Sequence, residues 1–479
     1  MQNFFEDTIC AAATPAGAGG IAVIRISGTV ALDVADRITD VSAVSTVPQS
    51  SFVPRRVYYK EVYNSDGSLL DNVLLTYFKT PYSYTGEDVV EISCHASPYI
   101  VRTILSLCLA AGARIARAGE FTQRAFLNGK LDLSQAEAVA DVIASENAAS
   151  HRLAIMGLRG GVSAEISMLR SELLNLTSLL ELELDFGEED VEFASRSELR
   201  KLLEKIALHA NTLRNSFALG NAIKEGIPVA IIGKPNAGKS TLLNALLGDE
   251  KALVSEVAGT TRDAIEDTVI INGIKFRFID TAGLRNSDDI VERMGVERTL
   301  SKMRQASIWL YVFDITDISL EQAYSEVAAL KPNVDAASAD AASVPQVIFI
   351  GNKIDKLSEQ QLSVLHNNSL MPASNNIFLS AISAQSSQLD CLREALIELS
   401  GANAVSQNQV ILTNARHYEI LGKVMDGLSQ IKTEIESGLS ADLLSQQLRT
   451  VLDCLGEITG QITTDDVLAN IFSRFCIGK

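Results

Sequence analysis

The chain has 479 residues and a formal net charge of −18 at pH 7, from 41 lysines and arginines against 59 aspartates and glutamates. This length predicts several domains, and the acidity argues against a surface generally coated for nucleic-acid binding. No stretch reaches the roughly 18 consecutive apolar residues of a membrane span, the first ten residues are not typical of a secretory signal, and six scattered cysteines without a C-x-x-C pair favour a reducing cytoplasm over a disulfide framework or zinc site.

The first predicted domain, 1–120, is a mixture of strands and helices. Runs rich in β-branched residues, bounded by Gly, Pro or Asp, predict strands over 19–28, 71–78 and 88–95. A locally basic run, 114–130, extends across the end of this domain, and in it Arg114, Arg117, Arg124 and Lys130 outnumber Glu120. This run is a candidate RNA contact, although solvated helix and loop charges are the more common explanation for such a run.

Helical periodicity dominates the second predicted domain, 121–220. Ser134 is a candidate N-cap, with Glu137 three residues later as in a capping box. Apolar residues at helical spacing continue through 165–184 and 196–217, with an acidic turn at 185–193 between them.

Between 221 and 400 short apolar strands alternate with helical segments, which predicts a parallel sheet. The alanine–serine-rich stretch 332–345 predicts a flexible surface loop. Residues 401–479 return to helical periodicity. The expected fold is therefore multidomain α+β and α/β: an N-terminal α+β domain, a helical domain, and a Ras-like P-loop domain inserted into the helical domain.

The segment GKPNAGKS (233–240) has the form G-x-x-x-x-G-K-[ST] and lies between a predicted strand and a predicted helix. In this motif, backbone N–H groups surround the phosphates; Lys239 neutralises the β- and γ-phosphates and Ser240 binds Mg²⁺.

Three further motifs follow in order. AGTTRD (258–263) offers Thr261 to complete the Mg²⁺ coordination, and DTAG (280–283) places Asp280 at the metal through water and the Gly283 N–H near the γ-phosphate. NKID (352–355) supplies Asp355, whose carboxylate accepts from the ring N–H and amino group of guanine, and Ser380–Ala381 can donate to the guanine carbonyl. Together they predict a GTP-binding domain.

One departure concerns hydrolysis. Ras-like enzymes place a water-orienting glutamine after DTAG, but this chain has Leu284, which cannot polarise water. Asp288, Asp289 and Glu292 are the alternative candidates, each of which could instead compensate the charge at a helix N-terminus.

Over nearly its whole length the sequence resembles the tRNA modification GTPase family called MnmE or TrmE. The resemblance rests on TPAGAGGIAVIRISG, YTGEDVVEISCH, GEFTQRAFLNGKLDLSQAEAVADVI, GKPNAGKSTLLNALL, AGTTRD, DTAGLR and the terminal CIGK. It implies that residues 1–120 form a folate-binding-like domain that mediates homodimerisation. It also implies a heterotetramer with an FAD-containing partner, MnmG. This assembly adds an aminomethyl or carboxymethylaminomethyl group at C5 of the wobble uridine of certain tRNAs, with a reduced folate (5-formyl- or methylene-tetrahydrofolate) as one-carbon donor.

The resemblance also implies site residues. Folate contacts correspond to Arg25, Glu91, Lys130 and Lys479, although Ala96, Ser97 and Pro98 stand where the family pattern has glycines. Potassium stimulates hydrolysis in the family, and its binding positions correspond to Asn236, Ser255, Val257 and Thr260. Glu292 corresponds to the family's catalytic glutamate. The complete set expected to bind GTP is Asn236, Ala237, Gly238, Lys239, Ser240, Thr241, Ser255, Glu256, Val257, Ala258, Gly259, Thr260, Thr261, Asp280, Thr281, Ala282, Gly283, Asn352, Lys353, Asp355, Ser380 and Ala381.

The final residues, FCIGK, leave three interpretations of Cys476 open. A prenylation box is disfavoured because Lys479 is a poor final residue for it. A buried structural cysteine is the usual alternative. The resemblance favours the third, a functional thiol near the folate that acts as a nucleophile or acid–base group.

Two other functions compete with tRNA modification by a GTPase. A ribosome-assembly GTPase would carry a basic RNA-binding appendage such as a KH module, whereas this C-terminal region is helical and the chain acidic. A folate-dependent aminomethyltransferase with an accessory GTPase is the other alternative.

Overall fold

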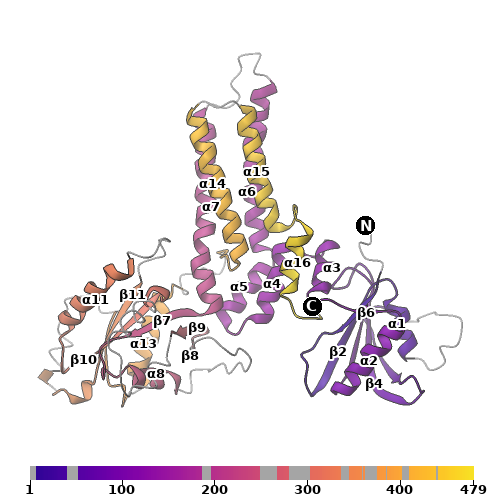
Figure 1. Cartoon of the computed structure of the whole chain (residues 1–479), viewed down its shortest axis with the longest axis horizontal. Helices are drawn as coiled ribbons and strands as arrows, with labels where there is room; N and C mark the ends of the chain where they lie inside the picture. The colour runs from indigo at the N-terminus through magenta and orange to yellow at the C-terminus, as the bar shows by residue number, and fades with distance from the viewer. Residues whose placement is uncertain are drawn as a thin grey trace. The chain divides into compact units, whose positions relative to one another are not determined.

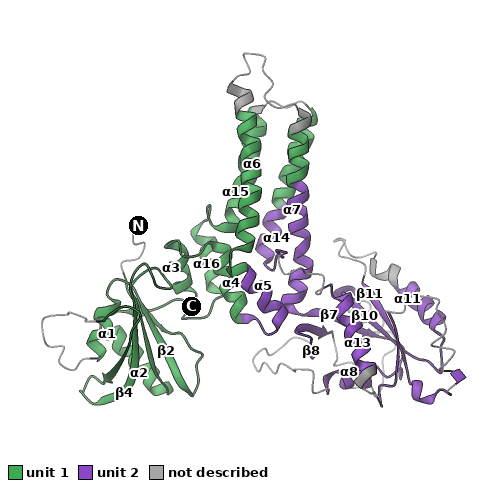
Figure 2. Cartoon of the chain, turned by 180° about the vertical axis from the view of Figure 1, so that it is seen from behind, with its two compact units in different colours: residues 1–143, 157–206, 423–479 green, residues 144–156, 207–422 purple. Residues whose placement is uncertain are grey.

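The computed structural model describes residues 7–39, 52–185, 196–248, 267–279, 303–335, 345–358, 360–361, 375–383, 386–401, 409–437 and 441–478, with elements labelled in Figure 1. They form two compact units, coloured in Figure 2. The first consists of 1–143, 157–206 and 423–479, and the second of 144–156 and 207–422. Each unit contains a six-stranded sheet.

The sheet of the first unit has the order β3-β4-β5-β2-β1-β6 and is antiparallel except for the β1–β6 pair. Its strands are β1 (Ile9–Ala12), β2 (Gly19–Ser27), β3 (Val57–Tyr63), β4 (Leu69–Phe78), β5 (Val89–Ala96) and β6 (Arg114–Ile115).

The two faces of this sheet differ because side chains alternate along each strand. One face is covered by α1 (Ala31–Thr39) and α2 (Pro98–Ala110), and a buried core forms there around Ile24, Ile92 and Ile104. The neighbouring positions on β2 and β5, Arg25 and Glu91, belong to the opposite face and are cross-strand partners.

Helices make up the rest of the first unit. They are α3 (Glu120–Leu127), α4 (Leu133–Ala144), α6 (Gly161–Asp185), α15 (Ala441–Thr459) and α16 (Asp465–Ser473), joined by parts of α7 (Arg196–Glu225) and α14 (Ala415–Ser437). α6 and α15 pack side by side, and Arg449 of α15 donates to Glu181 of α6 over 2.6 Å. The two helical stretches therefore pack together although the second sheet separates them in sequence, as predicted.

The sheet of the second unit has the order β12-β11-β10-β7-β9-β8, parallel except for the β8–β9 hairpin. Its strands are β7 (Ile227–Ile232), β8 (Asp267–Ile271), β9 (Ile274–Phe278), β10 (Ile308–Asp314), β11 (Gln346–Asn352) and β12 (Asn376–Leu379). α8 (Lys239–Leu247) and α13 (Ser386–Leu399) share one core with the sheet, and α11 (Leu320–Asp335) belongs to a separate core. The remaining elements of this unit are α5 (Ala148–Leu158) and the short helix η2 (Ile354–Lys356).

Two local predictions were wrong. The capping box of α4 is formed by Asp132 and Gln135: the Gln135 N–H donates to Asp132 Oδ1 over 2.9 Å, and the Asp132 N–H donates to Gln135 Oε1 over 3.0 Å. Ser134, the predicted cap, lies inside the helix. Residues 332–335, predicted to belong to a loop, are helical because α11 continues to Asp335; residues 336–344 lie outside the described part of the chain.

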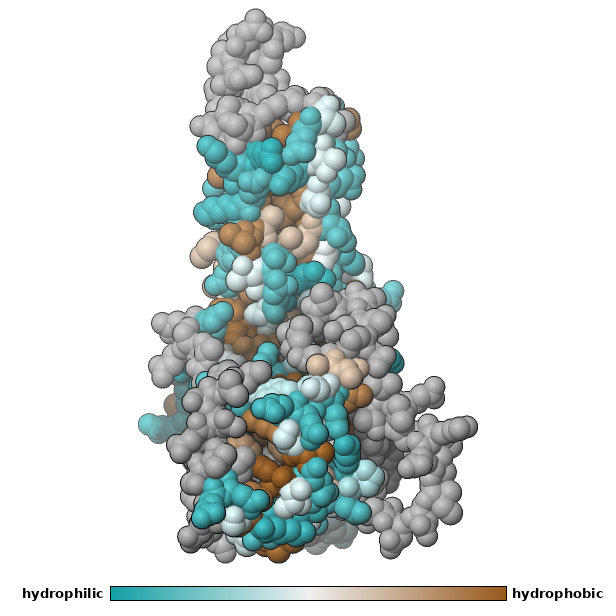
Figure 3. Space-filling view, turned by 90° about the vertical axis from the view of Figure 1, so that its left-hand side faces the viewer, coloured by the Kyte–Doolittle hydropathy of each residue, from teal (hydrophilic) through white to brown (hydrophobic). Residues whose placement is uncertain are grey.

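The described helices are amphipathic elements of a folded protein. Figure 3 shows one face, where hydrophilic side chains cover much of the described surface and hydrophobic ones gather in smaller areas. Among the helices in the described ranges, none has the length and apolar character needed to cross a membrane.

Candidate functional site

A glycine-containing loop follows β7 and leads into α8. Gly233 has φ +141°, and a Cβ there would lie 2.0 Å from the Val312 carbonyl oxygen. Gly238 has φ +97°, and a Cβ there would lie 2.0 Å from Asn352 Nδ2. Only glycine fits these two positions, because a side chain would be strained and would collide. The loop is thereby held close against two neighbouring strand ends.

Lys239 begins α8 directly after this loop. Its Nζ donates to the carbonyl oxygens of Gly233, over 2.8 Å, and Lys234, over 2.6 Å. Burial lowers the pKa of Lys239. The helix N-terminus and this ammonium place positive charge at the loop, which is the arrangement that binds phosphate. Ser240 and Thr241 stand in the first turn of the same helix.

Asn352, at the end of β11, connects the loop with the next strand end. Its Nδ2 donates to the Ala237 carbonyl over 2.7 Å, and its Oδ1 accepts from the N–H of Lys353 and of Ala381. The side chain is almost fully buried. Asn352 therefore acts as a cross-link, a role that its place in the NKID motif did not reveal in advance.

Asp355 lies exposed on η2, beside the end of β12. The Ser380 hydroxyl donates to Asp355 Oδ1, and Lys353, with φ +69°, precedes η2. Lys353 Nζ contacts Asp314 Oδ2 at 2.6 Å. Burial alone would raise the pKa of Asp314, but donation from Lys353 and Thr316 outweighs it and the pKa is lowered. We did not predict Asp314, whose signal is its position at the carboxyl end of a parallel strand.

The structure thus brings together one part of the predicted nucleotide site. Asn236, Ala237, Gly238, Lys239, Ser240 and Thr241 lie in or after the loop, and Asn352, Lys353, Asp355, Ser380 and Ala381 lie at the adjoining ends of β11 and β12. Outside the described residues are Ser255, Glu256, Val257, Ala258, Gly259, Thr260, Thr261, Asp280, Thr281, Ala282, Gly283, Glu292 and Lys479.

A second group of candidate residues lies in the first unit. Arg25 Nε donates to Glu91 Oε1 over 3.0 Å, and the guanidinium lies 5.2 Å from the ring centroid of Tyr84 and 5.6 Å from that of Phe121. These aromatic rings were not predicted from the sequence. They hold a cation in a fixed position through cation–π attraction, while the Arg25 and Glu91 side chains stay partly exposed.

Lys130, the third predicted folate contact, follows α3. Its Nζ donates to the Pro81 carbonyl over 2.9 Å, and its methylenes lie beside Gly86. Lys130 therefore contacts the same 81–86 segment that supplies Tyr84, whose hydroxyl hydrogen-bonds with Thr122 of α3 at 2.9 Å.

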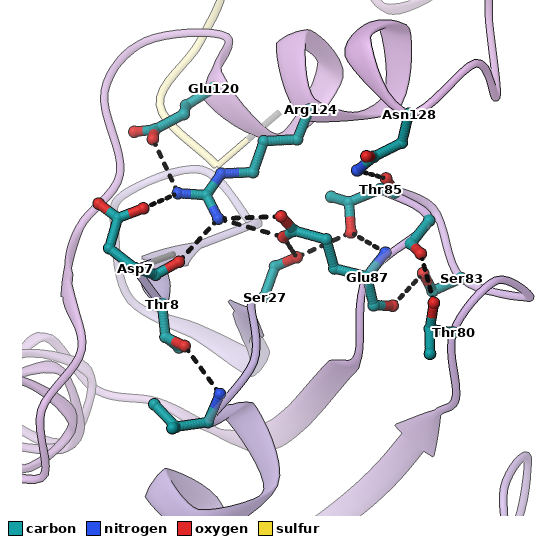
Figure 4. Close-up of polar contacts among 12 residues, drawn as sticks. Asp7, Thr8, Ser27, Thr80, Ser83, Thr85, Glu87, Glu120, Arg124 and Asn128 are labelled. Atoms are coloured by element: carbon teal, nitrogen blue, oxygen red, sulfur yellow. Dashed lines mark hydrogen bonds and ion pairs between the residues drawn. The ribbon is translucent and has the colours of Figure 1, made fainter. Parts of the chain in front are cut away.

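Part of the basic run 114–130 lies inside the domain, whereas Arg117 and Lys130 are exposed; an RNA contact of this run stays a prediction. Arg124 is fully buried and pairs with Asp7, Glu87 and Glu120 (Figure 4). Arg114 pairs with Asp7 and Glu120 as well. Buried guanidinium groups require such partners. The network fixes α3, and with it Phe121, against the sheet.

The segment before Lys479 also packs on this domain. Phe472 and Phe475 lie against Gly119, and Ile477 forms an antiparallel bridge with Ala118. Gly478 has φ +99°, and a Cβ there would lie 2.2 Å from the Ala12 carbonyl oxygen, so only glycine fits. Ala12 pairs with Ile24, the neighbour of Arg25.

Cys476 is exposed on this segment. The buried-cysteine alternative is therefore wrong. A chemical role for the thiol stays a prediction.

The parallel sheet, the phosphate-binding loop and the paired NKID and Ser380–Ala381 motifs define the second unit as a P-loop GTPase domain. Comparison with known proteins extends this to the whole chain. The model described as "MnmE helical domain" matches residues 133–476, and "GTP-binding protein TrmE N-terminus" matches 8–130. The chain belongs to the MnmE family of tRNA modification GTPases.

Relatives that match over their full length support the same family assignment. Proteins named tRNA modification GTPase MnmE from Bacteroides thetaiotaomicron and Cytophaga hutchinsonii are each 48% identical to it, over 99% of this chain and 100% and 98% of their own lengths. The Flavobacterium psychrophilum protein of that name is 47% identical, over 99% of this chain and 100% of its own. The predicted family, fold class and GTPase activity are confirmed.

Proposed function

We propose that this GTPase modifies tRNA: together with an MnmG-type FAD protein, it builds an aminomethyl or carboxymethylaminomethyl group at C5 of the wobble uridine, with a reduced folate as one-carbon donor. The observation that carries the proposal is the packing of the 475–478 segment on the strand next to Arg25. This packing supports a site to which the candidate folate residues and Cys476 both contribute. Relatives that are 48% identical to the chain are named for tRNA modification.

The nucleotide contacts follow from the second unit. GTP phosphates fit the 233–240 loop and Lys239, and Asp355 with Ala381 fits guanine. Ser240 and Thr261 would hold Mg²⁺. Asn236, Ser255, Val257 and Thr260 would hold K⁺, which supplies positive charge between the phosphates. Asn236, with φ +60°, lies within the loop, which agrees with a backbone shaped around an ion or phosphate.

The Arg25–Glu91 pair fits a folate. The Arg25 guanidinium can donate to a folate carboxylate, and the partly exposed Glu91 carboxylate can accept from the N–H edge of a pterin. The bound folate supplies the one-carbon unit. The protein's own contribution is to orient it, because Tyr84 and Phe121 fix Arg25 and the buried Arg124 network fixes Phe121.

Two protein partners are part of the proposal: a second copy of the chain and the FAD protein. On the sheet face that carries Arg25, Tyr59 and Leu74 are cross-strand partners that expose 68% and 47% of their surface. Exposed apolar side chains of this kind mark association surfaces. A homodimer through the N-terminal domain is therefore proposed, and Leu74→Glu should shift the sedimentation coefficient toward that of a monomer.

Folate binding tests the proposal directly. Titration calorimetry with 5-formyltetrahydrofolate should show binding to the purified chain. Arg25→Gln should weaken it by about tenfold to a hundredfold, because a hydrogen bond to a charged group contributes about 1.5–3 kcal/mol. Arg55→Gln is the matched control, since Arg55 also stacks on a tyrosine, Tyr82, in the same domain. If the unaltered chain binds no folate, or if both variants behave alike, the folate site is wrong.

A further inference from the structure

The turn between β8 and β9 has a distinctive place in the chain. Asn272 and Gly273 form a two-residue turn, with φ +48° and +77°, between the paired residues Ile271 and Ile274. Such turns suit Asn-Gly because both residues need positive φ. In the sequence this hairpin stands between AGTTRD and DTAG, the two motifs that carry the predicted contacts to Mg²⁺ and the γ-phosphate.

The turn contacts the start of α5 in three ways. The Gly273 carbonyl accepts from the Ala149 N–H over 3.0 Å. A Cβ on Gly273 would lie 2.9 Å from the Ala148 Cβ, so the turn packs closely against the Ala148 methyl group and leaves no room for a side chain. Lys275 Nζ contacts Glu146 Oε2 at 2.8 Å, with the lysine 18% and the glutamate 37% exposed.

The first of these contacts completes the N-terminus of α5. The first backbone N–H groups of a helix lack partners within the helix. In α5 the Ser150 N–H is satisfied by Asn147 Oδ1 over 2.9 Å, and the Ala149 N–H is satisfied by the hairpin turn. Moving the turn would therefore leave a helix donor without its partner.

α5 also packs against the two chain segments that connect the sheet with the long helices α7 and α14. Leu153 of α5 forms a buried cluster with Ile223, near the end of α7, and Ile411, just before α14. α7 leads into β7, and residues 409–414 lead from the sheet into α14. A shift of α5 would thus act on both connections at once.

We propose that the contact between the β8–β9 turn and α5 is a nucleotide-dependent coupling contact, stronger in one nucleotide state than in the other, which transmits the state of the GTP site to α7 and α14. The motifs on either side of such a hairpin change their contacts when the γ-phosphate is lost. Because the turn packs closely against α5, a displacement of the hairpin would displace α5 or break the contact. The proposal rests on the GTPase activity alone and not on the folate or tRNA role.

A double-mutant cycle on the full chain tests the coupling. Glu146→Gln, Lys275→Met and the double variant are titrated with fluorescent GDP and with a fluorescent, non-hydrolysable GTP analogue. For each nucleotide, the cycle gives the factor by which the effect of one substitution on affinity depends on the other substitution. This factor should differ by about twofold to fivefold between the two nucleotides, the range of a partly exposed ion pair. The reversed pair, Glu146→Lys with Lys275→Glu, should restore the difference. An equal factor in both states, with folding verified by thermal unfolding, overturns the proposal.

The substitution Gly273→Ala is a second, independent test of the coupling contact, and it has a matched control. Gly67 lies in another hairpin turn with φ +82° and nothing within 4 Å of an added Cβ, so Gly67→Ala adds similar backbone strain without a collision. Gly273→Ala should change the ratio of GTP-analogue to GDP affinity by about twofold or more, and Gly67→Ala should not. The same ratio in both variants would contradict the coupling.

Discussion

The side-chain amide of Asn352 donates to the backbone carbonyl of Ala237 over 2.7 Å. The bond joins the motif at the end of β11 to the loop that follows β7, and the same side chain also accepts from Ala381. Asn352 thus holds the predicted phosphate and base contacts in one rigid frame. Such preorganisation lowers the cost of ordering a site on binding.

Asn352→Ala should weaken GTP binding by at least about tenfold and lower the free energy of unfolding by about 1–3 kcal/mol, since buried partners are left unsatisfied. Equilibrium titration and urea unfolding measure the two effects. Asn376→Ala is the control, because Asn376 accepts from Tyr324 in the same sheet. It should lose stability and keep GTP affinity. Equal loss of affinity in both variants would mean that Asn352 has no special place in the site.

Asp355→Asn should change base specificity from guanine toward xanthine, because an amide can donate to the carbonyl that replaces the guanine amino group. Competition between GTP and XTP for the purified variant measures the change. Asp317→Asn replaces another exposed aspartate of the same domain and should keep the preference for GTP. Unchanged GTP preference in Asp355→Asn would remove this residue from the base pocket.

The Arg124 network should make stability depend on pH. Burial alone would raise the pKa of Glu120, but donors from Arg114, the Arg117 N–H and Arg124 outweigh it, and the pKa is lowered. A carboxyl with a lowered folded pKa contributes stability above its unfolded pKa, and this contribution is lost as the pH falls through the folded pKa.

Glu120→Gln should therefore lower the free energy of unfolding by about 3–5 kcal/mol at pH 7, as for a broken buried pair. It should also flatten the acid limb of a stability profile from urea unfolding. Glu204 pairs with Arg200 and Lys432 on an exposed surface, so Glu204→Gln should leave the profile nearly unchanged. An acid limb of unaltered steepness in Glu120→Gln would contradict the role given to the network.

Hydrolysis is predicted to need potassium and Glu292. Replacing KCl by NaCl should slow turnover, and Glu292→Ala should lower kcat with little change in GTP affinity, because a group that orients water acts in the transition state. Glu321→Ala, on α11, provides the control. Full activity of Glu292→Ala would show that Glu292 does not orient the attacking water, and Asp288 or Asp289 would be tested next.

Local patterns predicted the strands and the phosphate loop well, because β-branched runs and glycines act over a few neighbouring residues. They missed β1, β3, β8 and β12. β6 has only two residues, too few for a period. The α4 capping box was misassigned by two residues because serine and aspartate are both good caps.

Charges and aromatic rings were harder to place. Arg124 belongs to a basic run in sequence, yet it is neutralised by Asp7, which lies 117 residues away in the chain. Arg25 is enclosed by Tyr84 and Phe121, which come from a loop and a helix far along the chain. Composition and periodicity carry no information about such distant partners, so the setting of a site is seen only in the folded structure.

The central claim is that the chain modifies the wobble uridine of tRNA and uses the exposed Cys476 of the docked 475–478 segment to do so. Its most direct test is mass spectrometry of tRNA nucleosides from a strain that lacks the gene, complemented with the unaltered chain, with Cys476→Ser, or with Cys391→Ser, which replaces another exposed cysteine. We expect modified wobble uridine to disappear in the deletion strain, to return with the unaltered chain and Cys391→Ser, and to stay absent with Cys476→Ser although its GTP hydrolysis is nearly normal. An unchanged nucleoside profile in the deletion strain, or normal modification with Cys476→Ser, would contradict the claim.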